Sequence, residues 1–424
     1  MTSLERRREN RYRRRKEKRE EKKKKLYGDC DNFQNLINYR ALYLANRKSK
    51  RGVTWKASVQ RYQMNLLKNL EMTQSALEKG QDITKGFVEF DTMERGKLRH
   101  IRSIHFSERV VQRSVCDNAL VPMLRRSLIY DNGACLPGKG IDQSLDRLEA
   151  HLQKFYRKNN FSNEGWAVLF DFSGFFDNIL HEHCFWIYRI AFSDGKILWL
   201  LSCFVIPFGC PNIGRRNNPA IRRKNSRKGY TGKSLGLGSQ ISQITAVAYP
   251  NAIDHYIKER LHVRFYGRYM DDGYMLFRTK ESAKKAIAAL KRLCPKLGIK
   301  LNEKKTRIAK IKHGIRFLKV KMTLTETGKV KRRMTRKSIV RQRRKLKKFA
   351  AEVQKGNMTL EDAKTSHASW KGHAIRRGGA MAARKLDELF EALFGVKAPV
   401  CKIKKRRKRK WQKKKSRRNR SRRA

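Results

Sequence analysis

The chain has 424 residues, of which 39% are hydrophobic, so it is long enough for two to four domains and a substantial core. Its 103 Lys and Arg residues exceed its 37 Asp and Glu residues, which gives a formal charge of +66. Self-repulsion on that scale predicts a polyanionic partner, with nucleic acid ahead of an anionic membrane surface. No apolar run approaches about 18 residues and no signal peptide is recognised, so we expect no membrane partner and a cytoplasmic protein.

The eight cysteines are scattered and form no C-x-x-C pair. This argues for a protein of a reducing compartment, and against both a zinc ribbon and a disulfide framework. The first 25 residues are mostly Arg, Lys and Glu. They predict either a charged helix or a disordered arm that lies along phosphates, with a simple solubilising tail as the alternative. From about residue 32 to residue 79 the apolar residues recur at helical spacing.

After Gly80 the pattern changes to strands. Residues 87–90 and 97–104 flank a turn-forming stretch and predict a β-hairpin whose second strand interleaves apolar and basic residues. Ser107 then precedes a run with an apolar face and is expected to cap a helix over 107–120. L-P-G-K-G at 136–140 opens a further helix at 141–156. This loop is either a plain turn or a contact with a phosphate or a template through backbone N–H groups.

The stretch 166–180 reads as an apolar strand that delivers Asp171 at its end, with a break at Ser173–Gly174 and a helix from Phe175. An acid at such a position is either a helix cap or a catalytic group. H-E-H-C at 181–184 is interpreted as a helix start in preference to a metal site.

Residues 206–233 are rich in Gly, Asn, Pro and basic residues and predict a surface loop or insertion that touches nucleic acid. A helix is expected from Ile244 to about Leu261, with a kink at Pro250. Another helix is expected over 282–294, and a short strand over 317–322.

F-Y-G-R-Y-M-D-D-G-Y-M-L-F at 265–277 has the pattern of strand, tight turn and strand, with Gly273 expected where the backbone bends sharply. Two adjacent carboxylates, Asp271 and Asp272, sit at the turn and repel one another. A divalent cation would compensate them, and oxygen ligands suit Mg²⁺; an ordinary exposed Asp-Gly turn is the alternative. Asp171 supplies a third carboxylate, which predicts a two-metal site for phosphoryl transfer.

The C-terminal part, from residue 336 to residue 394, is predicted to be helical, with breaks near 356–357 and 378–379. The tail from Lys402 is almost wholly basic around Trp411.

Taken in order, these motifs resemble those of bacterial retroelement reverse transcriptases over about residues 87–325. R-H-I-R-S-I-H-F-S-E-R-V-V-Q and L-P-G-K-G resemble the two fingers motifs of that family. F-D-F-S-G-F-F-D and Y-M-D-D resemble the motifs that carry its catalytic aspartates. L-N-E-K-K-T and F-L-K resemble its later lysine and primer-grip motifs, although F-L-K lacks the usual Gly after Leu.

The resemblance implies an α+β right-hand polymerase with fingers, an antiparallel palm sheet flanked by helices, and a helical thumb. The enzyme expected is an RNA-directed DNA polymerase that uses two Mg²⁺ ions, with Mn²⁺ as the alternative ion. Its partners would be a template RNA, a primer with the growing cDNA strand, and dNTPs. The domains are placed, in order, at 1–30 (basic arm), 31–165 (fingers), 166–325 (palm), 326–396 (thumb) and 397–424 (basic tail).

The resemblance also assigns roles to the matching residues. The expected metal ligands are Asp171, Asp271 and Asp272, and the expected proton donor is Lys305. The expected dNTP contacts are Arg99 with Lys97 or Arg102, Phe176 as the barrier to a ribose 2′-OH, and Leu237, Gly238 and Gln243. The expected nucleic-acid contacts are Lys139, Tyr269, Met270, Phe317 and Leu318.

L-G-S-Q-I-S-Q at 237–243 separates the subtypes. Most relatives have Gln-Gly, three residues, then Ser-Pro; here Leu237 and Gln243 stand in place of the Gln and the Pro. This resembles the diversity-generating retroelement enzymes, which copy a template-repeat RNA with errors opposite adenine and work with a small basic accessory protein. A bacterial or phage-encoded enzyme is implied. The alternatives are a group II intron-like enzyme, a defence-associated enzyme, and a non-catalytic RNA-binding protein on a polymerase scaffold.

Overall fold

The computed structural model describes residues 2–94, 96–210 and 230–401. The chain divides into two compact units. The first comprises Met1–Leu318 and Leu324–Lys329, and the second comprises Lys319–Thr323 and Val330–Ala424. None of the helices within the described residues has both the length and the apolar character needed to cross a bilayer. The expected loop at 206–233 and the basic tail fall largely or wholly outside the described residues.

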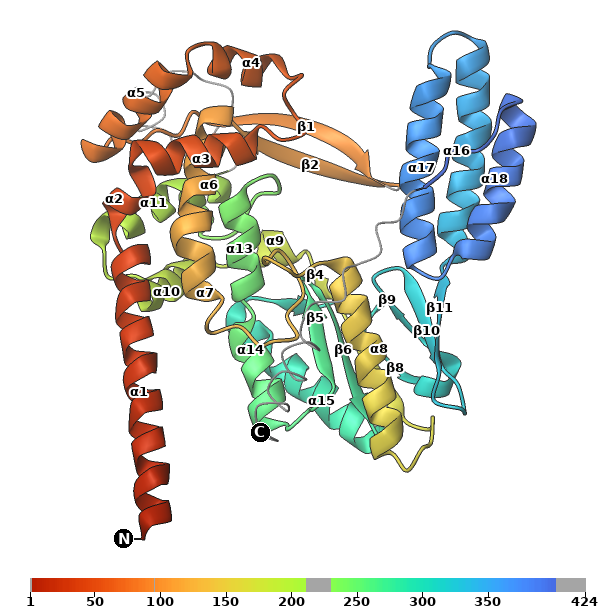
Figure 1. Ribbon diagram of the computed structural model, residues 1–424, viewed down its shortest axis with the longest axis horizontal. Helices are drawn as coiled ribbons and strands as arrows, with labels where there is room; N and C mark the ends of the chain where they lie inside the picture. Colours follow the sequence, from red (N-terminus) through yellow and green to blue (C-terminus); the bar gives the residue numbers. More distant parts are fainter. Residues whose placement is uncertain (1, 95, 211–229, 402–424) are drawn as a thin grey trace, which may run out of the picture. The chain divides into compact units, whose positions relative to one another are not determined.

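The first unit begins with five helices, of which the last four, over residues 33–78, lie where the apolar spacing predicted helices (Figure 1). The basic N-terminal stretch is the helix α1 (Ser3–Cys30), which starts with a reciprocal capping box between Thr2 and Glu5. The helices that follow are α2 (Phe33–Ile37), α3 (Tyr39–Ser49), α4 (Ala57–Met64) and α5 (Leu66–Glu78). Their buried residues join the main core of the unit.

The predicted hairpin is present as β1 (Phe87–Glu94) and β2 (Lys97–Ile104), paired antiparallel along their whole length. The helix after it, α6 (Phe106–Val115), runs into a π-helical turn, η1 (Cys116–Leu120), and then α7 (Val121–Leu124). The expectation that Ser107 caps this helix is wrong. The cap is His105, whose ring accepts the Ser107 N–H, because the helix begins one residue earlier.

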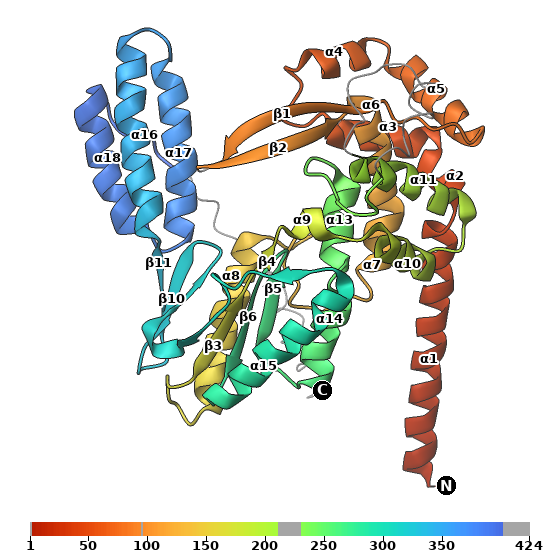
Figure 2. The ribbon, with the colours of Figure 1, turned by 180° about the vertical axis from the view of Figure 1, so that it is seen from behind.

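A four-stranded antiparallel sheet in the order β5-β6-β3-β8 lies at the centre of the unit. Its strands are β3 (Trp166–Phe170), β5 (Tyr266–Tyr269), β6 (Asp272–Phe277) and β8 (Arg307–Lys310). The consecutive residues Tyr274 and Met275 point to opposite faces. Tyr274 meets His151 of α8 (Ile141–Lys158), whereas Met275 shares a core with Ala286 of α15 (Lys280–Leu293). These two helices therefore cover opposite faces (Figures 1 and 2).

The segment after β3 also follows the prediction, with β4 (Phe172–Ser173) and then α9 (Phe175–Asn178). H-E-H-C does start a helix, α10 (His181–Ala191), which is followed by α11 (Gly195–Val205). The His181 ring contacts the Tyr230 hydroxyl at 2.9 Å and the Ser234 carbonyl at 2.6 Å. Both ring nitrogens thus have protein partners, which supports the structural interpretation of this motif.

The single kinked helix expected from Ile244 to Leu261 is instead two helices. The first, α13 (Gln240–Ala248), starts four residues earlier because the Ser239 side chain caps it. Pro250 then precedes α14 (Asn251–His255), and a π-helical turn, η3 (Tyr256–Arg260), ends the segment. A proline lacks the N–H that a continuous helix would need at that point.

The expected strand at 317–322 is also wrong, because a turn interrupts it. β9 (Ile315–Phe317) ends where Leu318 and Lys319 both adopt positive φ, and β10 (Val320–Leu324) begins after them. The second unit contains β11 (Val330–Met334), beside β10, and three helices. These are α16 (Arg336–Gln354), α17 (Leu360–Arg376) and α18 (Ala380–Phe394), which confirm both predicted breaks. The expected α+β class with antiparallel strands is confirmed.

Candidate active site

The two adjacent carboxylates lie at a tight turn between β5 and β6, as predicted. Tyr269 pairs with Asp272, so only Met270 and Asp271 form the connection. The left-handed residue is Met270, with φ 56°, and not Gly273, which lies inside β6. The expected bend at Gly273 is therefore wrong. Glycine is required there by packing, because a Cβ would lie 2.2 Å from the ring of Phe170 on β3.

Asp171 joins the other two acids because β3 lies beside β6. The register pairs Phe170 with Gly273, so the residue after β3 arrives next to the start of β6. The Phe172 N–H donates to the Asp271 carbonyl at 3.3 Å, and the Asn302 N–H donates to the Asp171 carbonyl at 2.8 Å. One carboxylate oxygen from each of the three aspartates lies within 4.8 Å of the others.

The three carboxylates fit a divalent cation. Burial, followed by the charge of Asp171, raises the pKa of Asp271. Burial and the charge of Asp271 likewise raise the pKa of Asp272 well above the range of a free aspartate. Crowded acids that oppose one another's ionisation are compensated when a hard cation is shared between their oxygens. Within the described residues this is the only group of acids, histidines and cysteines so arranged.

Lys305 lies at the edge of the same site. Its Nζ donates to Asp171 Oδ2 at 2.6 Å, and 52% of the side chain is exposed. Burial lowers the pKa of Lys305, but the hydrogen bond to Asp171 and the charges of the three aspartates raise it above its usual value overall. The Asn302 side chain approaches the same Asp171 oxygen at 3.3 Å. The sequence placed Lys305 here and did not single out Asn302.

A buried ion pair supports the turn from behind, and sequence reasoning missed it. Arg268 on β5 and Asp254 on α14 are both fully buried, with Nη2 and Oδ2 2.7 Å apart. Arg268 Nη1 also donates to the Met270 carbonyl at 2.8 Å, inside the catalytic turn. The Tyr266 hydroxyl donates to Asp254 at 2.5 Å. The available signal was a charged residue between aromatic residues in a strand that is otherwise apolar.

The basic residues of the hairpin divide between its two faces. Arg99 and Arg102 are three positions apart on one strand, so they point to opposite sides. The charge of Arg99 lowers the pKa of Asp271, although burial and the charge of Asp171 raise it overall. Arg102 instead donates to Glu89 at 2.8 Å and to the carbonyls of residues 208 and 210. The Arg102 guanidinium is therefore engaged by protein groups, and the expected triphosphate contact by Arg99 stays a prediction. Lys97 belongs to the same strand, in register with Glu94.

The other predicted dNTP contacts lie on connected segments. The Leu235 N–H donates to the Phe176 carbonyl at 2.8 Å, which ties α9 to the stretch that carries Leu237. Gly238 has φ 117°, and a Cβ there would lie 3.2 Å from the Arg102 carbonyl, so only glycine fits beside β2. Gln243 is exposed on α13.

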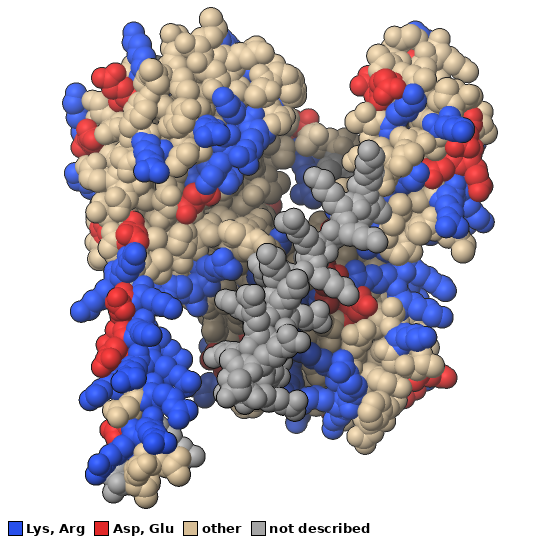
Figure 3. Space-filling model, viewed as in Figure 1, with Lys and Arg blue, Asp and Glu red and all other residues tan. Residues whose placement is uncertain are grey.

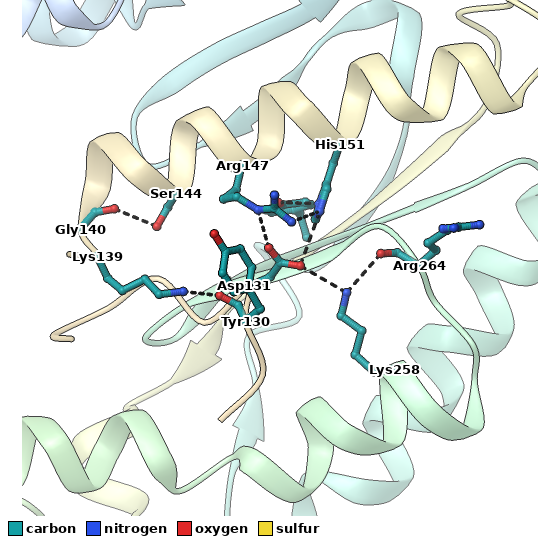
Figure 4. Close-up of polar contacts among 10 residues, drawn as sticks. Tyr130, Asp131, Lys139, Gly140, Ser144, Arg147, His151, Lys258 and Arg264 are labelled. Atoms are coloured by element: carbon teal, nitrogen blue, oxygen red, sulfur yellow. Dashed lines mark hydrogen bonds and ion pairs between the residues drawn. The ribbon is translucent and has the colours of Figure 1, made fainter. Parts of the chain in front are cut away.

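The L-P-G-K-G loop is held by protein contacts (Figure 4). Lys139 reaches the Tyr130 carbonyl and lies 4.3 Å from the centre of the Tyr130 ring. Asp131 pairs with Arg147 at 2.6 Å and lies 3.5 Å from Lys258. The backbone also pairs with β5, since the residue 133 N–H donates to the carbonyl of residue 268 at 2.9 Å. The expected contact between Lys139 and nucleic acid stays a prediction.

The remaining predicted nucleic-acid contacts differ in accessibility. Tyr269 and Met270 are partly exposed beside the acids, and Leu318 is partly exposed in its turn. Phe317, in contrast, is buried and packs edge-on against Tyr274 with ring centres 5.0 Å apart. Its side chain belongs to the core of the structure, whereas Leu318 and Lys319 of the same motif are accessible.

Residues 85–322, more than half of the chain, match the family model described as "Reverse transcriptase (RNA-dependent DNA polymerase)". The chain belongs to the reverse transcriptase family. The match contains the three aspartates, Lys305 and both predicted fingers motifs. The expected right-hand polymerase class agrees with the antiparallel sheet and this family, and RNA-directed DNA polymerase is the enzyme class that the family carries.

No curated protein matches the chain. Among solved structures, apo telomerase from Candida tropicalis, truncated from its C-terminal domain, is similar at 12% identity and a TM-score of 0.42. That similarity covers 58% of this chain and 55% of the telomerase. Telomerase from Candida albicans, in complex with a fragment of telomeric RNA, is similar at 11% identity and a TM-score of 0.43, over 77% of this chain and 59% of the telomerase. The chain thus spans less than two thirds of either telomerase, and the assignment rests on the family model.

Proposed function

We propose that this chain is an RNA-directed DNA polymerase of the diversity-generating retroelement type, which copies a template-repeat RNA into cDNA with errors opposite adenine. The observation that carries the polymerase activity is the group of Asp171, Asp271 and Asp272 within 4.8 Å. The observation that favours the subtype is L-G-S-Q-I-S-Q at 237–243.

The three aspartates would hold two Mg²⁺ ions, with Mn²⁺ as the alternative. Bound there, the ions would neutralise charge on the attacking and leaving oxygens of an in-line phosphoryl transfer. Lys305, whose Nζ donates to Asp171 at 2.6 Å and whose pKa is raised, would give a proton to the pyrophosphate leaving group. Arg99 would hold the triphosphate from the hairpin side.

Two residues of the chain would select the substrate. Phe176 would exclude a ribonucleotide by contact with its 2′-OH, and the backbone bond to Leu235 fixes its position. Leu237 would lie beside the nascent base pair, where most relatives have a polar Gln. An aliphatic side chain makes no hydrogen bond, so it removes a constraint on the geometry of the pair and lowers discrimination at that point.

The proposed partners are a template RNA, a primer with the growing cDNA, dNTPs, and a small basic accessory protein. The helix α1 supports the RNA partner, because Lys and Arg extend along its exposed length (Figure 3). The resemblance to bacterial retroelement reverse transcriptases also leads us to propose a cytoplasmic location and a bacterial or phage origin.

Deep sequencing of cDNA made by the purified protein on a defined RNA with a DNA primer tests this function. Errors concentrated opposite template adenines, with no product from Asp271→Asn, are the expected result. Leu237→Gln is the matched specificity variant, and it should lower the error rate at adenine while keeping synthesis. Accurate cDNA from the parent, or cDNA whose errors are spread evenly over all template bases, would favour the group II intron-like or defence-associated alternative. Absence of cDNA even with accessory protein and native RNA would favour an RNA-binding protein.

A further inference from the structure

A cavity of about 490 Å³ with both apolar and basic lining residues lies in the first unit, between the helices α4 and α5 and the segments at 81–85 and 105–107. None of the three aspartates of the candidate active site lines this cavity. In both ribbon views α4 and α5 lie beyond α6 from the four-stranded sheet (Figures 1 and 2). Its volume falls within the range of small-molecule sites, which is roughly 300–1,000 Å³.

Three cationic or protonatable side chains line this cavity, namely Arg61, Lys85 and His105. Arg61 and Lys85 come from segments more than 20 residues apart, and the charges of both act on the His105 ring. Because His105 Nδ1 accepts the Ser107 N–H, the neutral ring carries its proton on Nε2. The lining therefore offers several N–H donors and a positive field.

One buried hydroxyl lines the same cavity without a hydrogen-bond partner. Tyr62 is 6% exposed, and its hydroxyl has no partner at hydrogen-bond distance and angle, although the nearby Thr73 hydroxyl is close enough to act on its pKa. The Thr73 hydroxyl gives its own proton to the Asn69 carbonyl at 2.7 Å. A buried hydroxyl without a partner costs about 1–3 kcal/mol, so a ligand that accepts from it would recover that cost.

The rest of the lining indicates what kind of anion fits. The one acid is Asp82, whose Oδ1 already accepts from the Thr84 N–H and hydroxyl at 2.9 and 2.7 Å. Met72 and Ile83 add an apolar wall, and Met72 is 60% exposed. A lining that combines cations and hydrogen-bond donors with apolar surface suits a phosphate that is joined to a base.

We propose that this cavity binds the phosphate of a nucleotide, with Arg61, Lys85 and His105 around the anion and the Tyr62 hydroxyl donating to it. The phosphate could belong to either of two ligands, a nucleotide within a single-stranded RNA or a free nucleoside triphosphate. The RNA source rests on the proposed function. The site is nevertheless tested by binding alone, so a failure of cDNA synthesis would leave it standing.

The experiment measures equilibrium binding of a short labelled single-stranded RNA by fluorescence anisotropy. The full chain is used in buffer without divalent cations, so that the carboxylate site does not hold nucleotide. Arg61→Gln with Lys85→Gln should weaken binding about ten-fold. The matched control is Lys284→Gln with Lys285→Gln, which removes the same charge from the exposed side of α15. Its loss should be several times smaller.

Tyr62→Phe is the sharper variant because it deletes one oxygen and keeps the ring that packs edge-on against Phe106. It should leave the melting temperature of the free protein unchanged or higher, yet weaken RNA binding about ten-fold. Competition then identifies the source. Displacement by a free nucleoside triphosphate assigns the cavity to free nucleotide, and displacement by unlabelled RNA alone assigns it to a strand. Equal losses in the two double variants, or parental binding by Tyr62→Phe, would overturn the proposal.

Discussion

Replacing Arg268 tests whether the ion pair behind the catalytic turn sets its geometry. Arg268→Met leaves Asp254 fully buried without a cation, and leaves the Met270 carbonyl without its donor. Removing one partner of a buried pair costs about 3–5 kcal/mol of unfolding free energy. Against a total of about 5–15 kcal/mol, this should lower the urea midpoint strongly. Loss of activity in this variant alone would therefore not separate folding from positioning.

The double variant Arg268→Met with Asp254→Asn separates the two effects. The neutral amide removes the stranded charge and still accepts from the Tyr266 hydroxyl. Stability should therefore return most of the way toward the parent, because a buried pair that is replaced as a whole costs little. The Met270 carbonyl still lacks its donor, and Met270 has a left-handed conformation that the bond helps to hold. Activity should therefore stay on the order of 10- to 100-fold below the parent.

Two assays make the comparison. Urea denaturation followed by circular dichroism gives the stability, and single-turnover extension of a DNA primer on RNA gives the rate of nucleotide addition. The Asp254→Asn single variant is the control, since it keeps the donor to Met270. A double variant that recovers both stability and full activity would refute the reasoning, because Arg268 would then serve folding alone.

Three further outcomes are expected. Gly273→Ala should destabilise the protein by about 1–3 kcal/mol and reduce activity, because its Cβ would lie 2.2 Å from the Phe170 ring; Gly28→Ala, in α1 with open space around it, is the control and should not destabilise. Burial lowers the pKa of His151 to about 4, so the unfolded chain takes up this proton first and stability should fall by about 2–3 kcal/mol as the pH drops from about 6.5 to 4. His151→Gln should flatten that slope in urea titrations, and an unchanged slope would assign it to other groups. Phe176→Ala should raise ribonucleotide incorporation relative to deoxyribonucleotide about ten-fold or more in a primer-extension competition, and an unchanged ratio would remove the steric role.

The sequence predicted the parts of the site that depend on local pattern. Alternating apolar residues around Asp271 and Asp272 specify two strands and a tight turn, and the apolar run before Asp171 specifies a third strand. That these strands are neighbours followed from the order of the family's motifs, because one sequence does not show strand pairing. The helices of the C-terminal part were predicted for the same reason, since their breaks coincide with glycines.

The sequence did not predict features that depend on distant contacts. Gly273 was interpreted as a bend, since nothing local shows that the Phe170 ring covers it. Arg102 was grouped with Arg99, although their spacing on one strand already separates their faces. Phe317 was assigned to primer contact from its motif, whereas its ring packs on Tyr274. In each case a partner remote in sequence decides the role.

The contacts behind the turn connect two motifs that appeared separate in the sequence. Arg268 binds Met270 through its side chain, and its carbonyl accepts the N–H of residue 133 in the segment that leads to L-P-G-K-G. Asp131 in the same segment is anchored to α8 by Arg147. A displacement of that segment would therefore be transmitted to the turn between β5 and β6 by Arg268, which contacts both. We therefore expect the placement of the acids to depend on the buried charges behind them, and this role would account for an arginine in a strand that packs in an apolar core.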